Sequence, residues 1–182
     1  MADEPVPTTA AKVVSLYNPA NVLTVLRIVL VPVFVVIVIA SGLTGKGARI
    51  AACLVFCLAS ATDFVDGWIA RKWSLVTSFG KVADPIADKA LTCAALVGLS
   101  SLGDLPWWVT VVILVREIGI TGLRFFVIRH GVIPASRGGK AKTLVQNLAI
   151  GLYLLPLTGA AASVRYWLLG VAVVVTLVTG VD

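Results

Sequence analysis

The sequence predicts an all-α integral membrane protein with six transmembrane helices. Of its 182 residues, 59% are hydrophobic and only 13% are charged, whereas soluble domains contain about 45–50% apolar residues. The mean hydropathy is +1.00. A bilayer core needs about 20 consecutive apolar residues per helix, and the chain contains six such stretches separated by residues that favour turns.

The spans are predicted at residues 22–42, 48–70, 79–102, 106–128, 143–161 and 164–181. Turn signals separate them at 41–42 with 45–47, and then at 71–74, 103–106, 130–142 and 162–163. Residues 8–17 could form a short interfacial helix that stops at Asn18-Pro19. We therefore expect an N-terminal segment, 1–21, and one membrane domain, 22–182.

The basic residues predict the orientation, because cytoplasmic loops carry an excess of Lys and Arg. Eight basic residues fall on the side of the N-terminus and three on the other: Lys12, Arg71, Lys72, Lys81, Arg129, Arg137, Lys140 and Lys142 against Lys46, Arg49 and Arg165. Both termini are therefore predicted to be cytoplasmic.

The net charge of +6 does not indicate nucleic-acid binding. The basic residues are scattered between apolar stretches, and no aromatic side chains are interleaved with them to form a basic platform. Membrane lipids and phosphorylated substrates are the expected partners.

Four aspartates are the strongest sign of chemistry in the sequence. Asp63 and Asp66 are three residues apart and Asp84 and Asp88 four apart, so each pair lies on one face of its helix. Two converging carboxylate pairs at membrane depth need compensating cations. Mg²⁺ or Mn²⁺ would suit these oxygen ligands, and two ions would balance four carboxylates.

The simpler alternative is that the aspartates only form salt bridges with neighbouring basic residues: Arg71, Lys72, Lys81 and Lys89. The surrounding residues favour a ligand site instead. Gly67, Ala70 and Gly80 are small enough for a bulky ligand to approach the backbone, and Arg71 is placed to pair with a phosphate.

These residues resemble a known family signature. Asp63-x-x-Asp66-Gly67-x-x-Ala70-Arg71, eight further residues, and Gly80-x-x-x-Asp84-x-x-x-Asp88 are similar to the complete motif of the CDP-alcohol phosphotransferases. Within that family, residues 18–27, 115–124 and 139–143 are most similar to the phosphatidylglycerophosphate synthase branch.

The resemblance implies transfer of a phosphatidyl group from CDP-diacylglycerol to glycerol 3-phosphate, with release of CMP, at a cell membrane. It also implies a homodimer. By position, Asp63, Asp66 and Asp84 would hold the metals, and Asp88 would be a shared ligand and the general base. The CDP site would be formed by the remaining motif residues: Gly67, Ala70, Arg71, Thr77 and Gly80, with Asn21 and Thr24, which could equally be helix caps.

The acceptor's phosphate calls for several cations. The candidates are Arg116, Arg124, Lys140 and Lys142. Arg116 could instead form a structural ion pair with Glu117 or an aspartate, and the other three could be positive-inside anchors.

Cardiolipin synthase and phosphatidylinositol phosphate synthase activities, from the same family, are the nearest alternatives. A divalent-metal or proton-coupled transporter is the alternative from another class, because intramembrane carboxylates also mark ion pathways. We expect a polar cavity that is open to the cytoplasm and to lipid, since a soluble acceptor must meet a lipid donor.

Overall fold

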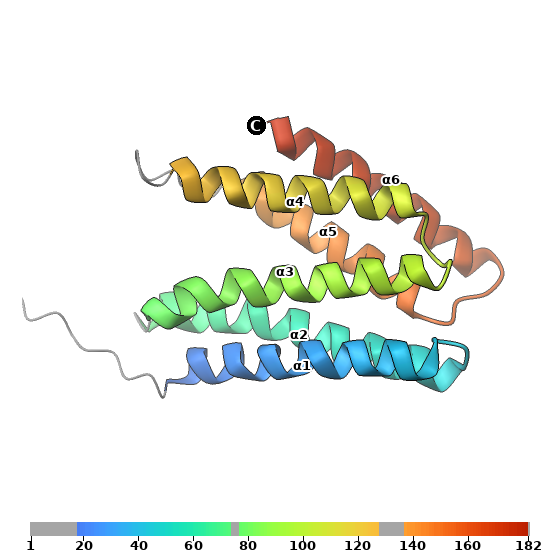
Figure 1. The fold of residues 1–182 in the computed structure, drawn as a ribbon, viewed down its shortest axis with the longest axis horizontal. Helices are drawn as coiled ribbons and strands as arrows, with labels where there is room; N and C mark the ends of the chain where they lie inside the picture. The colour runs from blue at the N-terminus through green and yellow to red at the C-terminus, as the bar shows by residue number, and fades with distance from the viewer. Residues whose placement is uncertain (1–17, 74–76, 128–136, 182) are drawn as a thin grey trace, which may run out of the picture.

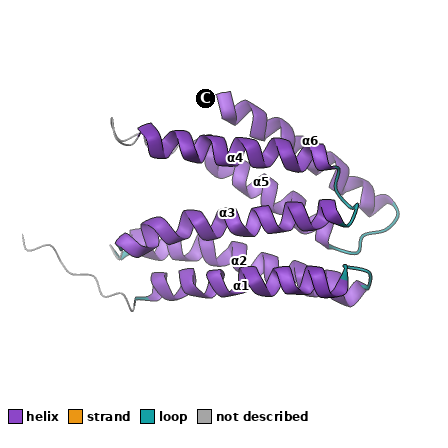
Figure 2. Cartoon of the chain, viewed as in Figure 1, coloured by secondary structure: helices purple, strands orange, loops and turns teal. Residues whose placement is uncertain are grey.

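The computed structural model describes residues 18–73, 77–127 and 137–181. This part of the chain forms an all-helical bundle (Figures 1 and 2). The helices are α1 (Pro19–Ser41), α2 (Lys46–Lys72), α3 (Ser78–Ser101), α4 (Trp107–Val127), α5 (Arg137–Leu154) and α6 (Ala160–Val181). The predicted interfacial helix at 8–17 lies outside the described residues.

α1, α2 and α3 form the part of the bundle that carries the aspartates. α1 packs most extensively against α2 and α3, and α3 lies between α1 and α4 (Figure 1). α5 packs against α2, α3 and α6. The centre is apolar, with Phe34 of α1 tilted against Phe56 of α2 and with Leu96 and Leu99 of α3 fully buried.

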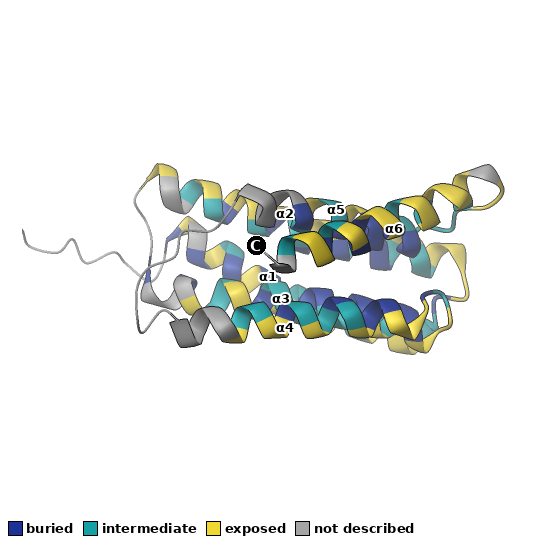
Figure 3. Ribbon diagram, turned by 90° about the horizontal axis from the view of Figure 1, so that it is seen from above, coloured by how far each residue is buried: buried dark blue, intermediate teal, exposed yellow. Residues whose placement is uncertain are grey.

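Exposed positions lie along every helix (Figure 3), and many of them are occupied by large apolar side chains. Ile39, Leu54 and Trp167 are 76%, 65% and 80% exposed. Apolar exposure on this scale is not expected of a soluble monomer. In the described residues, α1, α2 and α6 are each long and apolar enough to cross a bilayer, and the protein is a membrane protein.

The other three helices do not meet the same criterion in the described residues. Their charged residues account for this: α3 contains Lys81, Asp84, Asp88 and Lys89, α4 contains Arg116, Glu117 and Arg124, and α5 contains Arg137, Lys140 and Lys142. Several of these charges are paired inside the bundle, as described below.

The predicted boundaries of the last two helices are wrong. α5 begins six residues earlier than expected and ends at Leu154, and α6 begins at Ala160, so the helix includes the residues predicted as a turn at 162–163. Pro156 explains the break, because the residue before a proline disfavours helical geometry. Gly159 completes the turn with a φ of +62°, which glycine adopts at no steric cost.

Candidate functional site

One face of α1 is polar and is buried against the two aspartate helices. Asn21, Thr24 and Arg27 follow at intervals of three residues and are 5%, 1% and 0% exposed. Asn18 caps the helix by accepting a hydrogen bond from the backbone N–H of Asn21, and Pro19 occupies the first turn. The alternative that Asn21 and Thr24 are caps is therefore wrong.

Asn21 and Thr24 contact α3. Thr77 is the N-cap of α3, and its Oγ1 accepts from the N–H of Gly80 at 3.0 Å and donates to Oδ1 of Asn21 at 2.7 Å. A Cβ at Gly80 would lie 3.3–3.5 Å from oxygens of Thr77, Asp84 and Asn21, so glycine allows these groups to approach. Thr24 donates to Oδ1 of Asp84 at 2.6 Å.

The third residue, Arg27, contacts α2. Its guanidinium forms ion pairs with Asp63, at 2.8 Å between Nη1 and Oδ1, and with Asp66. Its Nε also lies 3.5 Å from Oγ1 of Thr62. Because Thr24 and Arg27 are one turn apart on α1, the α2 and α3 aspartates border the same stretch of that helix.

The aspartates have the chemistry of a divalent-cation site. The four carboxylates belong to two neighbouring helices, α2 and α3, and Mg²⁺ and Mn²⁺ prefer such hard oxygen donors. Asp63, Asp84 and Asp88 are only partly buried. In the described parts of the chain, however, no three carboxylate, imidazole or thiol groups are grouped closely enough to hold an ion. Arg27 neutralises the α2 pair instead, so an ion would have to compete with it for these oxygens.

A second charged cluster is centred on Glu117 of α4, which is 2% exposed. Its Oε1 accepts from Nη1 of Arg116 at 3.1 Å and is also paired with Lys142 of α5. Its Oε2 is paired with Lys89 of α3. We refer to Lys89, Arg116, Glu117 and Lys142 as the Glu117 cluster.

The Glu117 cluster adjoins the aspartates. The Nζ of Lys89 lies 3.9 Å from Oδ2 of Asp88 as well as pairing with Glu117. Arg116 also reaches α6, where its Nη2 donates to the carbonyl and Oγ1 of Thr179 at 2.8 and 3.0 Å. Carboxylates suited to cations therefore lie directly beside cations suited to a phosphate.

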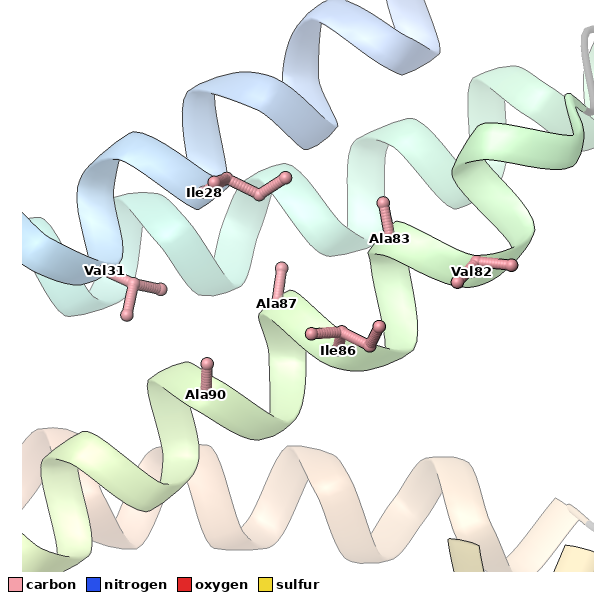
Figure 4. Close-up of a pocket in the computed structure, with 7 residues that line it drawn as sticks. All are labelled: Ile28, Val31, Val82, Ala83, Ile86, Ala87 and Ala90. Carbon is pink, nitrogen blue, oxygen red and sulfur yellow. The ribbon is translucent and has the colours of Figure 1, made fainter. Parts of the chain in front are cut away.

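An apolar groove of about 650 Å³ runs between α1 and α3. Figure 4 shows Ala83, Ala87 and Ala90 pointing from α3 toward Ile28 and Val31 of α1. All the lining residues are aliphatic: Ile28, Val31, Val82, Ala83, Ile86, Ala87 and Ala90. The lining residues of α3 lie on both sides of Asp84 in the sequence, and Ile28 of α1 lies about one turn after Thr24.

The CDP-alcohol phosphatidyltransferase family model matches residues 17–178. The chain belongs to this family. The match includes all four aspartates, Arg27 and the whole Glu117 cluster. The resemblance expected from the sequence is thereby confirmed over nearly the whole chain.

Curated phosphatidyltransferases of this family are similar to the chain over most of their length. The "Probable phosphatidylglycerophosphate synthase" of Mycobacterium tuberculosis is 53% identical over 165 residues, covering 91% of this chain and 79% of the relative. Two relatives are named CDP-diacylglycerol–glycerol-3-phosphate 3-phosphatidyltransferase. That of Bacillus subtilis is 41% identical, covering 77% and 78%, and that of Escherichia coli is 37% identical, covering 76% and 77%.

Several predicted site residues of this phosphatidyltransferase cannot be placed. The side chains of Ala70, Arg71, Arg124 and Lys140 lie outside the described side chains, although the helices that carry them are described. Gly67 is half-buried on α2. Of the four predicted phosphate-binding residues, the structure brings together Arg116 and Lys142.

The structure places Lys89 and Glu117 at the centre of the charged groups, beside the pairs that Arg27 makes. From the sequence, Lys89 and Glu117 were expected only as salt-bridge partners, Lys89 of the aspartates and Glu117 of Arg116. The available signal was their position inside apolar stretches, where a charged residue is costly and marks function by default.

Proposed function

We propose that this chain transfers the phosphatidyl group of CDP-diacylglycerol to glycerol 3-phosphate and releases CMP. The observation that carries this proposal is the contact between the two charged sets, in which Lys89 lies beside Asp88 and pairs with Glu117. A donor pyrophosphate needs cations held by carboxylates, and an acceptor phosphate needs cations of the protein. The names of the relatives support the same reaction.

We propose that all six helices cross the cell membrane, with both termini and the site at the cytoplasmic side. The distribution of Lys and Arg supports this orientation. Pairing supports the crossing of α3, α4 and α5, because charges inside a membrane are tolerated when they neutralise one another. Lys89, Glu117 and Lys142 form such pairs between these three helices.

We propose that Asp63, Asp66, Asp84 and Asp88 hold two Mg²⁺ or Mn²⁺ ions. Bound there, the ions would supply stabilisation of negative charge on the pyrophosphate. Gly67, Ala70, Arg71, Thr77 and Gly80 would form the CDP site, together with Asn21 and Thr24. The described contacts of Thr77, Asn21 and Thr24 are made within the protein, so their proposed role is to support the site's backbone and Asp84.

The proposed reaction exchanges one P–O bond for another. The acceptor hydroxyl forms a bond to the phosphatidyl phosphorus, the bond from that phosphorus to the CMP phosphate breaks, and Asp88 takes the hydroxyl proton. Asp88 is half-buried and lies beside the Glu117 cluster through Lys89. An acceptor whose phosphate is bound by Arg116 and Lys142 would therefore have its hydroxyls near this carboxylate.

The groove between α1 and α3 is proposed to take an acyl chain of the lipid donor. If the phosphates of the lipid donor lie at Asp84, its acyl chains must extend from there into apolar surroundings. The groove offers such surroundings close to Asp84. Val82 to Ala90 corresponds to about 12 Å of helix at about 1.5 Å per residue. The groove has only aliphatic lining residues, as an acyl chain requires.

Filling the deep end of the groove is expected to penalise long-chain donors. Ala90→Phe should raise the KM for dipalmitoyl CDP-diacylglycerol by about tenfold, the equivalent of about two unburied methylene groups at about 0.8 kcal/mol each. The KM for the dioctanoyl donor should hardly change. Ala161→Phe, at an exposed position of α6, is the matched control. An equal effect on both donors would exclude the groove as the acyl site.

The function itself is tested by CMP release from purified protein given CDP-diacylglycerol and Mg²⁺. Glycerol 3-phosphate, phosphatidylglycerol and inositol 1-phosphate are compared as acceptors, each with and without EDTA. We expect release with glycerol 3-phosphate only, abolished by EDTA. Release with phosphatidylglycerol or inositol 1-phosphate instead would favour the cardiolipin or phosphatidylinositol phosphate synthase alternative.

No release with any acceptor would contradict the proposed reaction. Metal-dependent flux into liposomes lacking CDP-diacylglycerol would then favour the transporter alternative. A homodimer stays a prediction from the family resemblance, and the mass of the detergent-solubilised protein measured by light scattering would test it.

A further inference from the structure

The Glu117 cluster has an arrangement that ordinary charge pairing does not require. One buried carboxylate is shared by three cations, which come from α3, from α4 itself and from α5. Both of its oxygens are used, because Oε1 is bound by Arg116 and Lys142 and Oε2 by Lys89. With Asp88, which lies 3.9 Å from Lys89, three positive charges face two negative charges, and the remaining positive charge would attract an anion.

Glu117 of α4 also pairs with α5, a helix that α4 does not otherwise contact in the described residues. Within the described residues, no backbone contact joins α4 directly to α5, whereas both contact α3 and α6. The ion pair between Glu117 and Lys142 connects α4 with α5. Arg116 and Lys142 are therefore bridged by a carboxylate and not by direct packing of α4 on α5.

We propose that Glu117 is the positioning residue that holds Lys89, Arg116 and Lys142 as one phosphate-binding set, and so selects acceptors that carry a phosphate monoester. This inference rests on the proposed function. Without the carboxylate, three nearby cations repel one another in a medium of low dielectric constant. The three side chains would move apart. Bringing them together again around a phosphate would cost free energy and so weaken phosphate binding.

The test is Glu117→Gln, which keeps the shape of the side chain and removes its charge. We expect the KM for glycerol 3-phosphate and the inhibition constant of inorganic phosphate to rise together by about tenfold or more, because the loss of one charge-assisted hydrogen bond to the phosphate is enough for a change of this size. The KM for CDP-diacylglycerol should stay within about twofold. A loss of folded protein alone would lower the apparent kcat and leave these constants unchanged.

Glu117→Asp keeps the charge on a shorter side chain and should give an intermediate rise in both constants. This variant tests the inference by itself if the glutamine variant fails to fold. Asp104→Asn, the same chemical change at the opposite end of the bundle, is the control. An unchanged KM for glycerol 3-phosphate in both Glu117 variants, or a lower one, would overturn the inference. If the wild-type protein releases no CMP with glycerol 3-phosphate, the proposed function fails instead.

Discussion

Asp88→Asn should lower kcat by a factor of about 10²–10⁴, the usual contribution of a general base. The asparagine side chain keeps the size of aspartate but cannot accept the proton of the attacking hydroxyl. Binding of CDP-diacylglycerol and of Mn²⁺ should be largely retained, because Asp63, Asp66 and Asp84 remain. The measurements are initial rates of CMP release, and Mn²⁺ binding by electron paramagnetic resonance on the same preparation.

Asp104 provides the matched control for this change. It pairs with Arg49, at 2.6 Å between Oδ2 and Nη2, at the end of the bundle away from the four aspartates. Asp104→Asn should leave kcat within about twofold, since the residue lies far from the reacting groups. A near-normal rate in Asp88→Asn would remove Asp88 from the role of base, whereas loss of Mn²⁺ binding would make it chiefly a metal ligand.

Arg27→Gln should destabilise the metal-free protein strongly and the metal-loaded protein much less. Removing one partner of a buried ion pair costs about 3–5 kcal/mol because the other charge is left uncompensated. Here Arg27 is fully buried and is the partner of both Asp63 and Asp66. A divalent ion would supply the missing positive charge.

The measurement is thermal unfolding of the detergent-solubilised protein in EDTA and across a Mg²⁺ titration. In EDTA the midpoint should fall by several degrees, as a change of this size implies, and Mg²⁺ should restore most of it. Because the guanidinium no longer competes, the variant should also respond at lower Mg²⁺ concentrations than the wild type.

Arg49→Gln is the control for Arg27→Gln, because it breaks an Arg–Asp pair whose side chains are each 20% exposed. Its smaller loss of stability should not depend on Mg²⁺. If Mg²⁺ raised the midpoints of both variants and of the wild type equally, the α2 carboxylates would not be the site at which the ion competes with Arg27.

The sequence was sufficient to predict six helices, the first four of them with boundaries within a few residues of those observed. Long apolar stretches and their turn residues are local signals, and backbone hydrogen bonds within a membrane must be satisfied inside each helix. The same locality explains the errors at the last two helices. Pro156 was included in a predicted span, although the backbone could not stay helical there.

The aspartate motif also required only the sequence, because i, i+3 and i, i+4 spacing fixes which side chains share a helix face. The family assignment followed from the same residues. Arg116 and Lys142 were likewise identified as candidates by charge and position. None of these inferences needed to know which helix packs against which.

The partners of the charges were decided only by tertiary structure. Arg27 is separated by more than thirty residues from Asp63 and Asp66, and Glu117 by more than twenty from Lys89 and Lys142. Their pairing depends on how α1 packs on α2 and how α3, α4 and α5 are arranged, which no local pattern encodes. A buried charge must find a partner wherever the fold brings one. The sequence alone therefore predicted the proposed reacting groups, and the packing of the helices determined which charges pair with them.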